Sequence, residues 1–453
     1  MEGTIMDNMA ASPSFGRVPG SLLPMNRPEA IARCQHLPTL RQLLRMNGIP
    51  VLREQDQSES IPMRRYRMLV HQFRVVKVWL AEGKSVWLDT MSALPQPLRF
   101  EEVPDHQDNT EIKKIEPMAI RSIYAVGLDV GIVEIAAMSE FRQAVITIRV
   151  DDESIEPYTS FLRQLQEEWE QQQLEALLRQ SEVVLGADPE FALRDPSGQM
   201  AFASRYVGRS GTIGYDAVRF REKPSALLHP LVELRPKPSA DPNELFVEMY
   251  RTMRLAATKK IAPELEWIAG GMPFDGYPIG GHIHFSGIAL NAAFVRKLDT
   301  YLALPLMLLE DGGCQRRRPR YGFFGDVREK SYGGFEYRTL PSWLVTPRVA
   351  KGILALAKVV ATHHRELRQD PLRRILVQSA YYQGDKATIR PIVRGLWREL
   401  SLLSTYQTYR QSLDPFFAEA MSAAAWFADE DFRPAWKLTV PSTTDDEDAI
   451  AVI

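Results

Sequence analysis

The chain has 453 residues, of which 45% are hydrophobic and 25% charged, and a formal net charge of −2. This composition is typical of a globular protein with two or three domains, and the near-neutral charge argues against nucleic acid or an acidic membrane as a partner. Only two cysteines occur, which excludes a disulfide framework and a cysteine-rich zinc site. No stretch approaches the roughly 20 apolar residues that span a bilayer, and residues 1–14 do not resemble a secretory signal. We therefore expect a cytoplasmic protein.

The N-terminal third predicts a small α+β domain. Residues 1–28 are rich in Met, Ser, Pro and Gly and are expected to be disordered. A short helix is predicted over residues 39–46, with leucines on one face and Gly48 as its stop. We assign residues 29–155 to this domain, whose role the sequence does not reveal.

Alternating apolar residues predict the strands of this domain. One strand is expected from Tyr66 to Leu80, turning at residues 82–83 and returning through residues 86–88. A second hairpin is expected over residues 130–150, with its turn near Ser139.

The remainder of the chain predicts a linker and a second domain. Residues 156–181 are rich in Glu and Gln and predict a helical linker. Residues 182–436 predict one large α+β domain, and residues 437–453 an acidic, disordered tail. Within the large domain the expected helices cover residues 298–309, 350–367 and 370–425, the last with a loop at 383–385.

Two pairs of polar residues lie on predicted strands of the large domain. Asp188 and Glu190 lie two residues apart, so on a strand they share one face, and two ionised carboxylates there favour a nearby cation such as Mg²⁺. Glu233 and Arg235 repeat this spacing between the apolar residues Val232 and Leu234. Taken alone, the first pair is equally compatible with a solvated turn and the second with a surface ion pair.

The most specific phrase is Gly280-Gly281-His282-Ile283-His284-Phe285-Ser286. It places two imidazoles and a hydroxyl on one face of a strand, directly after two glycines that permit close approach of another backbone or of a phosphate. An isolated strand histidine is more often a structural group than a ligand, but a pair at this spacing favours a metal or phosphate site.

Two further phrases supply cations. Arg317, Arg318 and Arg320 lie in an arginine-rich loop, and guanidinium groups bind phosphate oxygens in pairs of hydrogen bonds. Few aromatic residues interleave with these arginines, so a polynucleotide partner is not expected. Glu336 and Arg338 follow on one strand face.

The order of these phrases resembles the glutamine synthetase and glutamate–cysteine ligase superfamily, and most of all the phage-type carboxylate–amine ligases, or amidoligases. The resemblance covers residues 182–435 and leaves the first 180 residues unmatched. It implies a curved antiparallel sheet of the glutamine-synthetase-like type, with flanking helices and with the metal ligands on its inner face.

The resemblance also implies roles for individual residues. The implied metal ligands are Asp188, Glu190, Glu233, His282 and Glu336. Asp188 stands where glutamine synthetases usually have Glu, so its coordination is either direct or through water. The implied nucleotide- or phosphate-binding residues are His284, Ser286, Arg317 and Arg235. The implied catalytic contacts to the transferred phosphate are Arg338, Arg320 and Arg318.

The expected function is therefore ATP- and Mg²⁺-dependent ligation, with Mn²⁺ as an alternative ion. ATP would activate a carboxylate as an acyl phosphate, which an amine then displaces to form an amide or isopeptide bond. The expected partners are small-molecule or peptide carboxylates and amines, together with a protein partner through the N-terminal domain. Two alternatives stay open: a zinc-dependent amidohydrolase-type hydrolase, since His-x-His also opens such sites, and a non-catalytic nucleotide- or peptide-binding member of the fold.

Overall fold

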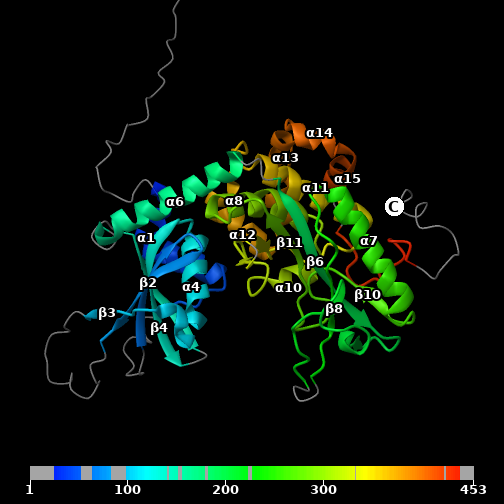
Figure 1. Ribbon diagram of the computed structural model, residues 1–453, viewed down its shortest axis with the longest axis horizontal. Helices are drawn as coiled ribbons and strands as arrows, with labels where there is room; N and C mark the ends of the chain where they lie inside the picture. Colours follow the sequence, from blue (N-terminus) through cyan, green and yellow to red (C-terminus); the bar gives the residue numbers. More distant parts are fainter. Residues whose placement is uncertain are drawn as a thin grey trace, which may run out of the picture.

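The computed structural model describes the following residues: 25–52, 64–82, 98–139, 142–150, 156–178, 182–222, 227–331, 333–422 and 425–438. An N-terminal part and a C-terminal part lie side by side, each built around its own sheet (Figure 1). The returning strand expected at residues 86–88, most of the N-terminal segment expected to be disordered and nearly all of the acidic tail lie outside the described residues. Within them, no helix is both long enough and apolar enough to cross a bilayer.

The described structure begins before residue 29 and ends after residue 436, the boundaries expected for the folded part of the chain. Asn26 lies inside the segment 1–28 but is buried, because its side chain donates to the Val130 carbonyl at 2.8 Å and accepts from the Val130 N–H at 3.1 Å. Leu438 lies inside the expected tail 437–453 and is also buried. The packed structure therefore includes Asn26 at one end and Leu438 at the other.

The N-terminal part contains a five-stranded antiparallel sheet in the order β3-β2-β1-β4-β5. Its strands are β1 (Arg64–His71), β2 (Arg74–Ala81), β3 (Phe100–Glu102), β4 (Val130–Ser139) and β5 (Arg142–Arg149). The hairpin expected over residues 130–150 is confirmed as β4 and β5. The single strand expected over residues 66–80 is wrong, since the chain reverses at Gln72 and Phe73 and the two halves pair as β1 and β2. The alternating pattern hid this turn, because Gln72 adopts a positive φ of 53° without a glycine to mark it.

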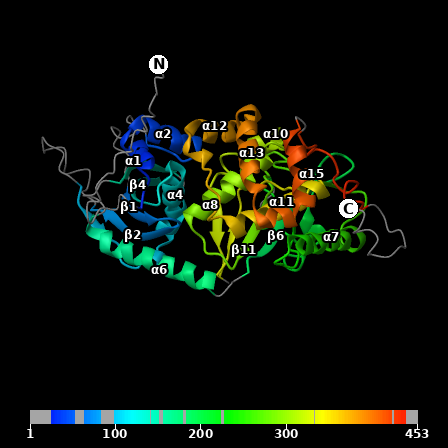
Figure 2. The same cartoon turned by 90° about the horizontal axis from the view of Figure 1, so that it is seen from above.

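Helices cover both faces of this sheet. Three of them pack on one face: α1 (Pro28–Gln35), α2 (Leu37–Met46) and α4 (Thr110–Val126). The helix α6 (Thr159–Leu178) packs Leu162 against Leu69, Val130 and Ile132 on the other face. Figure 2 shows α6 running under the N-terminal sheet and on toward the C-terminal sheet. Helices are thus present in both segments expected to be helical, residues 39–46 and 156–181, while the role of the second as a linker stays a prediction.

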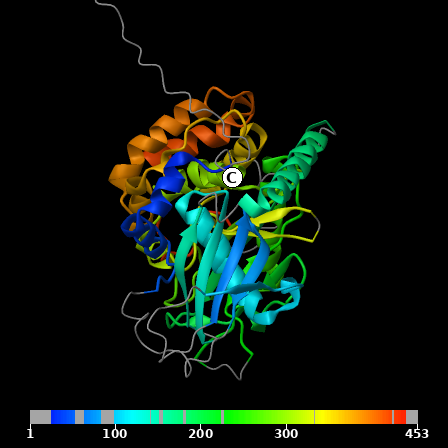
Figure 3. The same cartoon turned by 90° about the vertical axis from the view of Figure 1, so that its left-hand side faces the viewer.

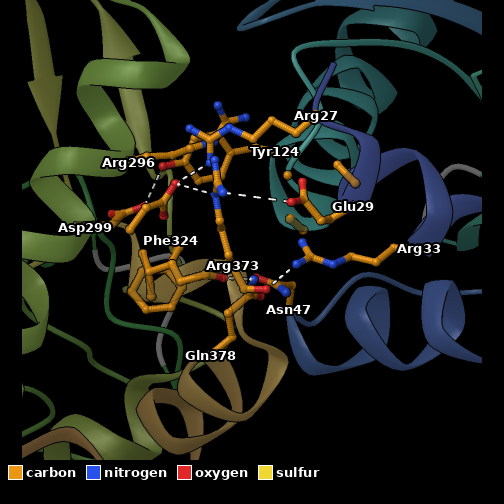
Figure 4. Close-up of a pocket in the computed structure, with 15 residues that line it drawn as sticks. Arg27, Glu29, Arg33, Asn47, Tyr124, Arg296, Asp299, Phe324, Arg373 and Gln378 are labelled. Atoms are coloured by element: carbon orange, nitrogen blue, oxygen red, sulfur yellow. Dashed lines mark hydrogen bonds and ion pairs between the residues drawn. The ribbon is translucent and has the colours of Figure 1, made fainter. Parts of the chain in front are cut away.

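Buried polar contacts join the two parts. Asp299 accepts from the Tyr124 hydroxyl of the N-terminal part at 2.6 Å and from the Tyr337 hydroxyl of the C-terminal part at 2.8 Å. Arg296 donates to the Leu128 carbonyl at 2.9 Å. Figure 4 shows Tyr124, Arg296 and Asp299 beside a small cavity between the parts. Arginines and carboxylates pair across it, Arg27 with Asp370 and Arg373 with Glu29. The cavity is therefore a junction closed by ion pairs.

The C-terminal part contains an eight-stranded antiparallel sheet. Six strands follow the order β12-β13-β11-β6-β9-β8, and β7 and β10 pair with the far end of β6. The strands are β6 (Val184–Arg194), β7 (Met200–Ala201), β8 (Ile213–Tyr215), β9 (Leu231–Leu234), β10 (Glu266–Ile268), β11 (Gly281–Ser286), β12 (Val327–Glu329) and β13 (Phe335–Tyr337). The four phrases singled out on predicted strands fall at β6, β9, β11 and β13, with Arg235, Gly280 and Arg338 one residue outside their strands.

A layer of helices lies against this sheet (Figure 1). The apolar strand residues Leu185, Phe191, Ile283 and Phe285 pack with these helices in the large core. The helices are α7 (Pro242–Lys259), α8 (Ala292–Leu298), α9 (Leu304–Met307), α10 (Gly312–Arg317), α11 (Pro347–His363), α12 (Ile375–Gln383), α13 (Lys386–Leu400), α14 (Ser404–Thr408) and α15 (Arg410–Met421). The helix expected over residues 298–309 begins earlier, because the Asn291 side chain caps it by accepting from the Phe294 N–H at 2.8 Å. The α+β class with antiparallel sheets is confirmed, while the funnel-like curvature stays a prediction.

Candidate active site

Strand register gathers the polar side chains of four strands on one face of the C-terminal sheet. Asp188 on β6 lies opposite His282 on β11, and His284 lies opposite Glu336 on β13. On the other side of β6, Glu190 lies opposite Glu233 on β9. Directly opposite residues of an antiparallel pair point to the same face. The sheet therefore brings together all five residues predicted as metal ligands, together with His284.

His282 lies at the centre of this cluster. Its Nδ1 is 3.3 Å from Asp188 Oδ1, 3.2 Å from Glu336 Oε1 and 4.0 Å from Glu190 Oε1. Burial acts to lower the pKa of His282, but the surrounding carboxylates outweigh burial and raise its pKa above the ordinary value. The imidazolium thus balances part of the negative charge of the cluster.

Asp188, His284 and Glu336 form a group with the geometry of a cation site. Each contributes one ligand atom, and these atoms lie within 4.8 Å of one another. His284 Nε2 is 3.0 Å from Asp188 Oδ2. Asp188 Oδ1 and Glu336 Oε1 are buried and accept no hydrogen bond from the described residues. Buried oxygens of this kind are costly unless a cation or a donor satisfies them, so this donor set fits a hard divalent ion.

The carboxylates of the cluster titrate differently from one another. Burial acts to raise the pKa of Asp188, but the neighbouring imidazoles of His282 and His284, 3.3 and 3.0 Å from its oxygens, hold it below its ordinary value. Burial raises the pKa of Glu190 to about 8, and burial together with the Asp188 charge raises the pKa of Glu233 to about 7. A bound cation would favour the ionised form of all three.

Two glycines make room for the cluster. A Cβ at Gly280 would lie 2.2 Å from His282 Nε2, and a Cβ at Gly281 would lie 2.5 Å from the Pro341 carbonyl oxygen. The Gly280 N–H also donates to Glu190 Oε2 at 2.8 Å. The close approach expected at these glycines is therefore made by the His282 ring and by a neighbouring backbone.

Three cations surround Glu336, and sequence reasoning placed only one of them in the site. Glu336 Oε2 is 2.6 Å from both the Arg328 guanidinium and Lys330 Nζ, and Glu336 Oε1 is 3.4 Å from Arg338 Nε. Burial acts to raise the pKa of Glu336, but His282, Lys330 and Arg338 help to lower it. Arg328 lies opposite Glu336 because β12 pairs with β13. Since β12 has only three residues, the sequence pattern did not predict this strand or the place of Arg328.

Arg235 and Ser286 lie at the margins of the cluster. Arg235 Nη2 donates to Glu233 Oε2 at 2.5 Å, while its Nη1 donates to the Arg209 carbonyl at 3.2 Å. Ser286 ends β11, two residues beyond His284 and on the same strand face.

The arginine-rich loop divides into buried and exposed members. Arg317 is buried and donates to the backbone carbonyl of Thr339 at 2.8 Å, behind the strand that carries Glu336. Arg318 is buried in an ion pair with Glu310 and stacks on the Tyr381 ring, 4.0 Å from its centroid. Arg320 is exposed. The structure thus engages the first two guanidinium groups in internal contacts.

The other three histidines of the C-terminal part contact groups outside the cluster. His229 Nδ1 lies 3.0 Å from the carbonyl oxygens of Asp216 and Val218. His363 Nδ1 lies 2.7 Å from Glu366 Oε1, and His364 Nδ1 lies 2.9 Å from the Ala361 carbonyl oxygen. The described residues therefore supply His282 and His284 as the imidazoles of the cluster.

Comparison with solved structures finds a weak likeness to a bifunctional glutathione synthetase from Pasteurella multocida, with 11% sequence identity and a TM-score of 0.35. The match covers 62% of this chain and 53% of the synthetase chain, so it spans about half the length of that protein. A likeness at this level carries no argument about fold or function.

Comparison with curated proteins finds no match. The family model of the phage phiEco32-like COOH.NH2 ligases, type 2, matches residues 185–438, which include every strand that contributes to the cluster. The match extends over more than half of the 453 residues, and the chain belongs to this family of carboxylate–amine ligases.

Proposed function

We propose that this protein is an ATP- and Mg²⁺-dependent carboxylate–amine ligase that forms an amide or isopeptide bond through an acyl phosphate. Family membership supports the reaction class. The observation that carries the finer proposal is the convergence of Asp188, His284 and Glu336 within 4.8 Å, with two buried carboxylate oxygens that make no well-formed hydrogen bond to a described residue.

The cluster would hold the divalent ion through its carboxylates and His284. We assign Asp188 and Glu336 to direct contact, and propose Glu190 and Glu233 as further ligands on the adjoining strands. Oxygen-rich sites suit Mg²⁺, and an imidazole ligand also makes Mn²⁺ acceptable. When bound, the ion supplies positive charge against the triphosphate and the transferred phosphoryl group. His282, held between the carboxylates, positions them.

The cations beside Glu336 would stabilise the negative charge on ATP and on the transferred phosphoryl group. The Arg338 side chain is 31% exposed although its Nε lies 3.4 Å from Glu336 Oε1, so the exposed part of its guanidinium can reach phosphate oxygens. Arg328 and Lys330 lie on the same side of Glu336. Preorganised cations of this kind are a large part of phosphoryl-transfer catalysis. Arg320 stays a proposed contact to the γ-phosphate, whereas the contacts of Arg317 and Arg318 favour a supporting role for both.

The carboxylate must be activated because amide formation in water is uphill. Transfer of the γ-phosphoryl group from ATP to the carboxylate oxygen breaks the bond to ADP and forms an acyl phosphate. The amine nitrogen then attacks the acyl carbon, and inorganic phosphate leaves. These two reaction steps require no nucleophilic side chain of the protein.

Family membership favours the ligase over the zinc-dependent hydrolase. The non-catalytic alternative would retain nucleotide binding without turnover, and only measurement separates it from the ligase. We also propose that residues 182–436 form the catalytic domain and that residues 29–155 help to present substrate.

The test is ADP release from Mg·ATP in the presence of pooled amino acids and short peptides, with hydroxylamine added to trap an acyl phosphate as a hydroxamate. We expect ADP release and hydroxamate formation that both require Mg²⁺ or Mn²⁺. The variant Glu336→Gln keeps the side-chain shape but removes its charge, and should slow ADP release by about 100-fold or more.

The control is Glu248→Gln, the same change at a helix residue that pairs with Arg251 on the surface. It should leave ADP release unchanged. Binding of Mg·ATP without ADP release in any pool would support the non-catalytic alternative. ADP release without hydroxamate would contradict the acyl phosphate.

A further inference from the structure

A large cavity lies between the two parts of the chain. It has a volume of about 630 Å³, within the range of ligand sites. One wall comes from the β1–β2 hairpin and from α6, and the other from residues 289–290 and from the loop that joins β12 to β13. Figure 3 shows the β12–β13 hairpin beside the N-terminal sheet and α6. Neither part could form this cavity alone.

The cavity reaches the candidate active site through Lys330. This residue lines the cavity, and its Nζ is 2.6 Å from Glu336 Oε2 in the cluster. A ligand in the cavity would therefore have one end beside the groups proposed to bind the metal and phosphate. The positive charge of Lys330 and the proposed ion favour a carboxylate at that end.

The lining combines apolar surface with amide and charged groups. Phe161, Leu165 and Leu290 supply apolar area, and Gln107 and Gln172 supply exposed amides. The charged lining residues are Arg74 and Glu329, which form an exposed ion pair at 3.1 Å, together with Lys330 and Glu168. A ligand that carries both charges, several amides and apolar side chains matches this lining better than a simple anion does.

Two observations indicate a hydrogen-bonding ligand. His71 is 8% exposed and lines the cavity, and its Nε2 is buried with no hydrogen-bond partner among the described residues. Such an atom is satisfied when a ligand or a water supplies a partner. In addition, β12 is the end strand of its sheet and contributes Glu329 to the cavity. An end strand leaves backbone donors and acceptors open to an extended chain.

We propose that this cavity binds a short peptide substrate in an extended conformation, with its reacting carboxylate at Lys330 and the rest of the peptide between β12 and α6. The inference rests on the proposed ligase function and adds its substrate class. It also gives the N-terminal part a role, since its hairpin and α6 select the peptide.

The test uses saturation-transfer difference NMR with a pool of tri- to pentapeptides of mixed sequence, with free C-terminal carboxylates, and the full chain with Mg²⁺ and a non-hydrolysable ATP analogue. We expect clear peptide signals with the wild-type protein. A matched pool with amidated C-termini should give signals at least tenfold weaker, since it lacks the carboxylate.

Substitution within α6 locates the binding site. Gln172 is exposed and lines the cavity, so Gln172→Trp should fill the cavity and weaken the peptide signals at least tenfold. The control is Gln171→Trp, the same change at the neighbouring exposed residue, whose side chain instead hydrogen-bonds Glu175 on the helix surface. Both variants should keep wild-type melting temperatures and bind the ATP analogue equally well.

The outcomes separate this inference from the ligase proposal. Unchanged peptide binding in Gln172→Trp, or no peptide binding to the wild type, overturns the cavity inference even if ADP release occurs. Peptide binding that Gln172→Trp abolishes supports the cavity even if no ADP is released, and the ligase proposal alone would then fail.

Discussion

Replacing Gly280 with alanine should damage the active site while leaving the fold intact. The added Cβ would lie 2.2 Å from His282 Nε2, 2.7 Å from Cδ2 and 2.9 Å from Cε1, whereas ordinary contacts begin at 3.4 Å. The ring must therefore retreat by about 1.2 Å. Its Nδ1 would then leave the positions 3.2 Å from Glu336 and 3.3 Å from Asp188.

The expected cost follows from this displacement. A misplacement of about 1 Å in a catalytic arrangement costs on the order of 100-fold in rate, which corresponds to about 2.7 kcal/mol in the activation free energy. We expect Gly280→Ala to slow Mg²⁺-dependent ADP release by about that factor. Its melting temperature should also fall, because overpacking around the buried His282 ring costs about 1–3 kcal/mol, so ADP release is measured well below that temperature.

The assay compares ADP release and Mn²⁺ binding, followed by electron paramagnetic resonance, in Gly280→Ala and in a matched variant. Gly208→Ala is the control, since an added Cβ there meets no atom within 4 Å. It should behave as wild type in both measurements. If Gly280→Ala releases ADP and binds Mn²⁺ as well as the wild type does, the close packing of Gly280 and His282 does not set the geometry of the cluster.

Two further predictions concern stability. Burial raises the pKa of Asp299 from its ordinary value of 3.8 to about 7. The stabilisation from its protonated form is therefore complete below pH 3.8 and is lost as the pH rises through 7. The unfolding free energy of the wild type, measured by urea relative to Asp299→Asn, should therefore fall by about 4 kcal/mol between pH 4 and pH 8. A constant difference would show that Asp299 is ionised throughout. Arg318→Met should cost about 3–5 kcal/mol of unfolding free energy, since it leaves Glu310 buried without its counter-ion. The double variant with Glu310→Met should recover most of that loss. If Arg318→Met instead keeps full stability and loses ATP affinity, Arg318 is a phosphate ligand.

The local pattern was enough to place the main polar groups on strands. Asp188 and Glu190, and His282 and His284, each lie two residues apart, and a strand puts such pairs on one face whatever surrounds it. The apolar residues between them, such as Ile283, correctly indicated the opposite, buried face.

Prediction from the local pattern failed where the chain reverses direction without a residue type that is typical of turns. The turn at Gln72 and Phe73 interrupts a pattern whose apolar residues keep the same alternation on both sides. No glycine or proline marks it, so one strand was predicted where the structure has two.

The arginines show most clearly what only the tertiary structure decided. Arg318 was predicted to contact the transferred phosphate and Arg328 was not, but helix packing buries Arg318 against Glu310, and strand pairing sets Arg328 opposite Glu336. A guanidinium carries the same charge in either place. Its role depends on which partner lies within a few ångströms, and that is fixed by contacts between segments distant in the chain. The sequence therefore determined which residues share a strand face, and the packing of strands and helices determined which of them meet.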